Sequence, residues 1–142
     1  MPKLTSPYLA LDLGDRFIGL AFSEAGIFVS ELQTIDRQGK SDDQIFRQIA
    51  EIIQKLEIKT LVVGLPISGN GSENDRCTQI RNFIFLLDAH IGASLPIIFF
   101  PEDYSSIDAN LLPKPKLNQK QKTSSHSQAA KIILERFLES GS

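Results

Sequence analysis

The sequence predicts an α/β fold in which a five-stranded mixed sheet is flanked by helices. Short apolar runs of strand length follow one another closely at the start of the chain. The apolar period then changes to that of helices, and helix and strand patterns alternate to the end. Short turns predict an antiparallel three-strand meander, whereas strands separated by helices are expected to be parallel.

The first three strands are expected within the first 35 residues. Tyr8 to Leu13 is almost continuously apolar, which is typical of a strand buried on both faces. Gly14-Asp15-Arg16 reads as a turn, and Phe17 to Phe22 as the returning strand. Ile27 to Ile35 is the third strand of the predicted meander.

A helix and a buried strand follow. Ser41 and Gln44 form a capping-box pattern at the helix start. The strand Thr60 to Val63 is expected to end at Gly64-Leu65-Pro66. The apolar face of the helix consists of Ile45, Ile49, Ile52, Ile53 and Leu56.

A second helix precedes the fifth strand. Ser72 with Asp75 resembles a cap, with Asp in place of the usual Glu or Gln. Leu95 to Phe100 has the apolar character of the fifth strand. The apolar face of the helix consists of Cys77, Ile80, Ile84, Leu87 and Ile91.

The last helix is expected after a loop rich in lysine. Asn110 to Lys122 contains two prolines and no acidic residue, which indicates a loop. A residue among Thr123 to Ser125 is the expected cap of the helix. Its apolar side includes Ala130, Ile133 and Phe137.

Composition sets the broad class of the protein. With 142 residues, the range 1–142 is expected to form a single domain. A net charge of -2 argues against a generally basic nucleic-acid binder, although a local basic patch remains compatible with it. Cys77 is the only cysteine, which excludes an internal disulfide and is typical of a packed residue in a reducing cytosol. No signal-peptide or membrane-span pattern is present, so a cytoplasmic protein without a membrane partner is expected.

Asp12 is the strongest candidate for a functional residue. It lies inside the apolar run Leu9 to Leu13, where burial of a carboxylate is costly unless it is paired, hydrogen-bonded or bound to metal. The structural alternative is an Asp that caps the following turn.

Glu102 is the second candidate. It follows the last apolar strand, at the carboxyl end where open α/β sheets usually bind ligands. If it converges with Asp12, a cation between the two carboxylates would relieve their repulsion, and Mg²⁺ or Mn²⁺ suits such hard oxygen ligands. Alternatively, Glu102 and Asp103 only solubilise a loop.

His126 shares a helical stripe with Ala130 and Ile133 and is expected to point toward the sheet near the helix N-terminus. The positive end of the helix would favour neutral imidazole and would attract phosphate. Its structural alternative is a partly exposed cap residue.

Two segments are candidates for contacts with nucleic acid. Gly64 to Ser72 is rich in glycine and precedes a helix, so its amides are expected to cradle a phosphate. The alternative for this segment is a plain connecting loop. The second segment is a later loop rich in lysine, for which the alternative is an ordinary solvated loop. The lysines of the later loop that would contact a nucleic-acid backbone are Lys114, Lys116, Lys120 and Lys122.

Four segments together resemble the YqgF/RuvX family, in the order and spacing of that family. Leu11 to Ala21 resembles its D-x-G motif followed by I-G-x-A, and Val62 to Ser72 resembles its V-G-L-P loop. Pro101 to Ala109 resembles its D-E-R motif, and His126 to Leu134 resembles its closing D-x-x-A-A-x-x-I-L helix.

This resemblance implies an RNase H-like fold and a metal-dependent nuclease that acts on structured nucleic acid. The implied substrate is the 5′ end of pre-16S rRNA in ribosome biogenesis or, alternatively, a Holliday junction in DNA. Carried over by position, the metal ligands and catalytic residues are Asp12, Glu102 and His126, with Mg²⁺ or Mn²⁺ as cofactor. The implied partners are pre-rRNA or branched DNA and ribosomal precursor particles, with the chain as a monomer or homodimer.

The chain departs from the family pattern at the third acidic position, where it has His126. This difference leaves open a second hypothesis, a catalytically weakened homologue that binds nucleic acid without efficient cleavage. A third hypothesis is a nucleotide-binding protein of the actin and hexokinase kind, since the Asp12-Leu13-Gly14 segment also resembles the first phosphate loop of that fold. The chain has no second loop of this type.

Overall fold

The computed structural model describes residues 5–67, 74–92, 95–103 and 119–140, and these residues form one mixed sheet with three helices. The order of strands in the sheet is β3-β2-β1-β5-β6, and β4 also pairs with β2. β1 is antiparallel to β2 and parallel to β5, which is parallel to β6. The predicted class, a meander joined to two parallel strands, is confirmed. The strands are β1 (Tyr8–Leu13), β2 (Phe17–Ser23), β3 (Ser30–Glu31), β4 (Ile35–Asp36), β5 (Thr60–Ile67) and β6 (Ile97–Asp103).

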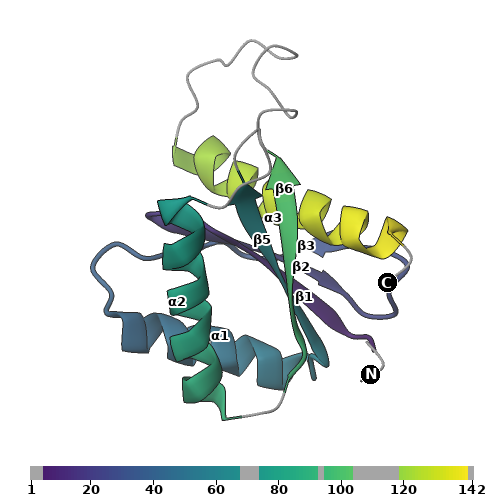
Figure 1. The fold of residues 1–142 in the computed structure, drawn as a ribbon, viewed down its shortest axis with the longest axis horizontal. Coiled ribbons are helices and arrows are strands. Elements are labelled where there is room, and N and C mark those ends of the chain that lie inside the picture. Colours follow the sequence, from purple (N-terminus) through teal and green to yellow (C-terminus); the bar gives the residue numbers. More distant parts are fainter. Residues whose placement is uncertain (1–4, 68–73, 93–94, 104–118, 141–142) are drawn as a thin grey trace.

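The helices cover the two faces of the sheet unequally. α1 (Asp42–Lys55) and α2 (Asp75–Ile91) lie on one face, and α3 (Gln119–Glu139) crosses the other (Figure 1). Among the described residues, no helix is long and apolar enough to cross a membrane.

The third predicted strand is wrong in extent. In place of one strand from Ile27 to Ile35, the structure has the two short strands β3 and β4, which pair with opposite ends of β2. Ile27 and Phe28 lie outside both pairings and are exposed, Phe28 to 85%. Apolar residues at these two positions therefore produced the misleading strand pattern.

The two parallel strands are longer than predicted. β5 continues through Gly64-Leu65-Pro66 to Ile67, and β6 continues to Asp103. Pairing between β5 and β6 runs to the last residue of each, so this long-range contact outweighs the local signal to stop. Pro66 is tolerated because β1 pairs with β5 only as far as Val63.

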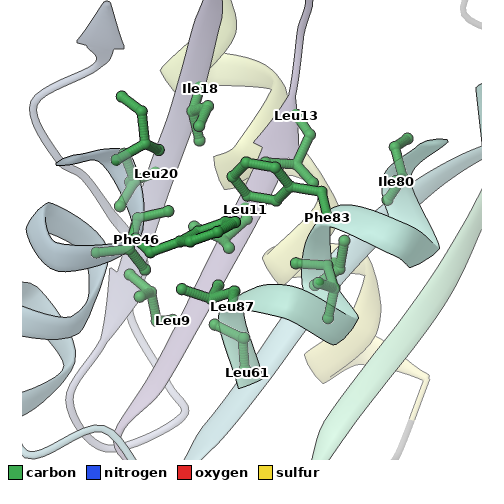
Figure 2. Close-up of a cluster of buried hydrophobic side chains, with 14 of the residues drawn as sticks. Leu9, Leu11, Leu13, Ile18, Leu20, Phe46, Leu61, Ile80, Phe83 and Leu87 are labelled. Atoms are coloured by element: carbon green, nitrogen blue, oxygen red, sulfur yellow. The ribbon is translucent and has the colours of Figure 1, made fainter. Parts of the chain in front are cut away.

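Alternate residues of each strand face opposite layers. On β1, Leu9 and Leu11 belong to the core cluster under α1 and α2, whereas Tyr8 and Ala10 belong to the cluster under α3. Figure 2 shows the first cluster, in which leucines of β1 lie close to side chains of the two helices. Asp12 continues the series that begins at Tyr8, so it faces α3.

The first two helices begin at side-chain caps. Ser41 caps α1 in a complete capping box with Gln44, as predicted. The predicted cap of α2 is wrong, because Asn74 is the N-cap and accepts a hydrogen bond from the Cys77 amide at 3.1 Å. Ser72 lies outside the described residues. Cys77 is buried, as expected for a packed residue.

The start of α3 is earlier than predicted. The helix begins at Gln119, so Gln119 to Lys122 belong to it and Thr123 to Ser125 lie within it. Gln and Lys are good helix formers, and they extend the helix toward its N-terminus beyond the Ser and Thr expected as caps. The rest of the predicted loop, residues 110–118, lies outside the described residues.

Candidate active site

Asp12 lies near the end of β1, on the face that α3 covers. It pairs in register with Gly19 of β2, and its side chain is 18% exposed. The neighbouring residues Leu11 and Leu13 point into the apolar layer on the other face. Strand alternation thus places one carboxylate at the partly open edge of the α3 layer.

Two arginines hold the backbone that follows Asp12. Arg76 of α2 donates to the Leu13 carbonyl at 2.6 Å, and Arg37 donates to the Gly14 carbonyl at 2.8 Å. Arg76 also forms an ion pair with Asp15. Charge-assisted hydrogen bonds of this kind are stronger than neutral ones, so they fix the turn and with it the position of Asp12.

Glycines allow α3 to lie directly on the strands beside Asp12. A Cβ atom on Gly19 would lie 2.0 Å from the His126 carbonyl oxygen, and one on Gly14 would lie 3.0 Å from His126 Cε1. Any larger residue at Gly19 would push the helix backbone away. The absence of a side chain at Gly19 of β2 and at Gly14 of the turn therefore sets the distance between His126 and the sheet.

Ser127 fixes the same stretch of α3 to the chain after β3. Its hydroxyl donates to the Leu32 carbonyl at 2.9 Å and lies 2.5 Å from the Thr34 hydroxyl. Ser127 is buried, and these contacts satisfy its polar atom. Because Ser127 is adjacent to His126, the pair of contacts also determines how the imidazole is presented to β1.

His126 faces the sheet, as its helical stripe indicated. Its Nδ1 atom lies 3.7 Å from Asp12 Oδ2, and its ring centroid lies 5.5 Å from that of Phe17. The predicted effect of the helix N-terminus is wrong. α3 begins at Gln119, two turns before His126, and the field of a helix end is confined to the first turn. Its carboxylate neighbour is Asp12.

Glu102 lies on β6, on the same face of the sheet as Asp12. Its side chain is only 2% exposed, and Oε2 accepts a hydrogen bond from Arg136 Nη1 of α3 at 2.8 Å. Burial raises the pKa of Glu102, Arg136 opposes this effect, and the negative charge of Asp12 adds to it. Glu102 is thus a buried carboxylate with a cationic partner rather than a residue of a solvated loop.

Asp12 and Glu102 share a face but contact different groups. β5 lies between their strands, which corresponds to a lateral separation of about 9.5 Å. Their α3 partners, His126 and Arg136, are ten residues apart, or about 15 Å along the helix axis. The sheet brings the two carboxylates close enough to interact electrostatically, while α3 provides each with its own nitrogen group.

The placement of these donors does not fit one shared divalent ion. Within the described ranges, no three His, Cys, Asp or Glu side chains are grouped so that they could hold a metal ion. Glu102 is engaged by Arg136, and Asp12 has the imidazole of His126 as its neighbour. The assignment of Asp12, Glu102 and His126 to one Mg²⁺ or Mn²⁺ ion therefore stays a prediction from the sequence.

The structure describes only some of the residues that were predicted to contact nucleic acid. Gly64 lies within β5, and a Cβ atom on it would lie 2.4 Å from Ile133 Cδ1, so the position serves the packing of α3. Its role in binding phosphate stays a prediction. Lys120 and Lys122 lie in the first turns of α3, whereas Ser72, Lys114 and Lys116 fall outside the described residues.

Three arginines near the site were not identified from the sequence. Arg37 and Arg76 contact the turn after Asp12, and Arg136 contacts Glu102. A charged residue in a loop, such as Arg37, or on a helix flank, such as Arg76 and Arg136, is normally solvated, so its type gives no signal. Only the order of strands in the sheet brings these arginines to backbone and side-chain acceptors far away in the sequence.

Comparison with known proteins identifies similar chains along almost the whole length. The family model described as "RuvX: Holliday junction resolvase" matches residues 6–140. A protein of Dictyoglomus thermophilum is 31% identical over 137 residues, covering 94% of this chain and 96% of its own length. One of Maridesulfovibrio salexigens is 35% identical over 133 residues, covering 92% and 96% respectively. Both carry the name "Putative pre-16S rRNA nuclease".

A solved structure shows the same fold at low sequence identity. It is Thermus thermophilus RuvC in complex with a Holliday junction substrate, with a TM-score of 0.57 and 11% identity. The match covers 94% of this chain and 93% of that one. The predicted RNase H-like fold is confirmed by this likeness together with the sheet topology.

Proposed function

Since the chain belongs to the RuvX family, we propose that it is a nuclease that cleaves structured nucleic acid, with the 5′ end of pre-16S rRNA as its substrate. The family predicted from the four motifs is confirmed, and with it the assignment to a family whose relatives are named nucleases. The choice of rRNA over a DNA junction is supported by the names of the relatives. The proposal includes action on ribosomal precursor particles in the cytoplasm, by a monomer or a homodimer.

One observation carries the assignment of the site, namely the approach of His126 to Asp12 at 3.7 Å near the C-terminal end of the central strand β1. This distance is too long for a direct hydrogen bond, and it places the imidazole beside the carboxylate. In the proposed reaction, Asp12 orients a water molecule and accepts its proton as the oxygen attacks phosphorus. His126 then carries this proton from Asp12 to the leaving oxygen as the bond from phosphorus to that oxygen breaks.

The experiment compares cleavage of a pre-16S rRNA fragment with cleavage of a four-way DNA junction, each with Mg²⁺ and with Mn²⁺ supplied. We expect cleavage of the RNA at its 5′ extension and a loss of about 100-fold or more in Asp12→Asn. Asp43→Asn is the matched control, because Asp43 is an exposed carboxylate in the first turn of α1. Undiminished cleavage by Asp12→Asn would overturn the site, and cleavage of the junction alone would overturn the substrate.

A second candidate function is binding of nucleic acid with weakened catalysis. The ion pair between Glu102 and Arg136 favours it, because this pair engages a carboxylate that the resemblance assigns to catalysis. RNA binding of equal strength in wild type and Asp12→Asn, without cleavage over a range of both metals, would support this function. Turnover that depends on Asp12 would reject it.

A further inference from the structure

The contact between Glu102 and Arg136 joins the most buried carboxylate of the site to a side chain that reaches it from solvent. Glu102 is 2% exposed, whereas the Arg136 side chain is 46% exposed. A buried carboxylate that remains ionised needs a paired cation, and Arg136 supplies one at 2.8 Å. The contact therefore compensates a charge that the sheet would otherwise bury alone.

The position of this pair matters for any metal ion at the site. Burial is the main cause that raises the pKa of Glu102, Arg136 lowers it, and the negative charge of Asp12 contributes least. A divalent cation that bound Glu102 would have to displace Arg136, or it would have to bind with the positive charge of Arg136 only a few ångströms away. Repulsion between like charges at such separations is large where water is partly excluded.

We propose that Arg136 is the resident counter-cation of Glu102 and competes with divalent metal for this carboxylate. This inference rests on the proposed function for its setting, because it concerns the site assigned there. In the wild-type chain, Glu102 is then not a metal ligand. Removal of the arginine charge makes it available as one.

The test measures Mn²⁺ binding by isothermal titration calorimetry on the intact chain without nucleic acid. Arg136→Gln is expected to bind Mn²⁺ at least about tenfold more tightly than wild type, because one repelling charge is removed. Lys131→Gln is the matched control, since it removes the same charge from α3 at a position without a contact to Glu102. It is expected to bind Mn²⁺ as wild type does.

Two further variants locate the gain at Glu102. The combination of Arg136→Gln with Glu102→Gln is expected to lose the increase in affinity. Glu102→Gln alone is expected to leave the affinity of wild type unchanged, and this variant does not depend on whether Arg136→Gln folds. A fall in Mn²⁺ affinity in Glu102→Gln, or an affinity of Arg136→Gln equal to that of wild type, would overturn the proposal.

These measurements separate the inference from the proposed function. Metal affinity is recorded without substrate, so failure to cleave RNA leaves every comparison among the four variants intact. Conversely, an active nuclease in which Glu102→Gln weakens Mn²⁺ binding would keep the proposed function and reject the role of Arg136.

Discussion

The face of the sheet under α1 and α2 carries large aliphatic side chains, whereas the face under α3 combines large residues such as Tyr8 and Phe100 with small ones, next to the ionisable groups of the site. On β1 the first face has Leu9 and Leu11 and the second has Ala10 and Asp12. The large residues fill a thick apolar layer. The small ones allow the backbone of α3 to approach the strands, which brings His126 to within 3.7 Å of Asp12.

This difference shows how one short sheet combines stability with a polar site. Among the described residues, the side chains buried in the layer under α1 and α2 are apolar apart from the Cys77 thiol, and their burial stabilises the fold. The face under α3 buries less apolar area, because glycines there allow close packing of the helix and because charged groups are buried there. Both features make this face less tolerant of substitution. Changes on the two faces should consequently affect stability and activity in different proportions.

The largest effect is expected for Gly19→Ala. Its new Cβ atom would lie 2.0 Å from the His126 carbonyl oxygen, and the helix backbone has no rotamer by which to move away. We expect the free energy of unfolding to fall by more than about 3 kcal/mol, beyond the usual range for overpacking, and nuclease activity to be lost. Urea denaturation and cleavage assays check this. Retained activity would show that α3 does not fix the site.

A change on the other face should lower stability without affecting the site. Ile49 of α1 is fully buried in the layer opposite α3. Ile49→Ala is expected to lower the free energy of unfolding by about 3 kcal/mol, from lost burial and the cavity that remains. At a temperature where the variant is folded, its kcat should equal that of wild type. A fall in kcat as large as the one in Gly19→Ala would break the contrast between the faces.

Gly64→Ala should give a smaller loss that a second substitution can reverse. The new Cβ atom would meet Ile133 Cδ1 at 2.4 Å, which is the end of a side chain rather than backbone. We expect destabilisation of about 1–2 kcal/mol. Ile133→Val removes the clashing methyl group and should restore most of this loss in the double variant. Thermal unfolding of the two single variants and the double variant measures the coupling, and strict additivity would contradict the proposed contact.

The helices, strands and fold class could be predicted from the sequence because apolar periodicity reflects burial directly. It failed at the ends of elements, where long-range contacts decide. β5 passes through Gly64-Leu65-Pro66 because β6 pairs with it there, and no local signal contains that pairing. The N-cap of α2, Asn74, was missed because a nearby Ser also had capping chemistry.

The candidate site was predicted in its residues but not in its contacts. Asp12 was conspicuous because a carboxylate in an apolar strand is unusual, and family resemblance added Glu102 and His126. The pairing of Glu102 with Arg136 depends on the order of strands and the path of α3, neither of which is local. Functional sites are also where local rules are most often broken, so patterns explain them least.

The smallest expected effect concerns how the free energy of unfolding depends on pH. It compares two carboxylates, Glu102 and Asp36, whose pKa values are shifted in opposite directions. Burial raises the pKa of Glu102 above its ordinary value of 4.5, so in that range the folded state holds more protons than the unfolded state. The free energy of unfolding therefore decreases as pH rises from 4.5 through the folded pKa. Glu102→Gln should remove this decrease. For Asp36, the hydrogen bond from Arg16 lowers the pKa below 3.8, so its stabilisation is lost as pH falls through the folded value.

Asp36→Asn is accordingly the matched control. It should remove the loss of stability that wild type shows at low pH, whereas Glu102→Gln should remove the decrease at higher pH. Urea denaturation from about pH 3 to about pH 7 measures both slopes relative to wild type. Asp36 is exposed on β4, so its change should be the smaller one and should weaken further with added salt. Equal slopes in wild type and Glu102→Gln would mean that Arg136 fully offsets the burial of Glu102. The charged groups of the α3 face would then cost the fold no stability.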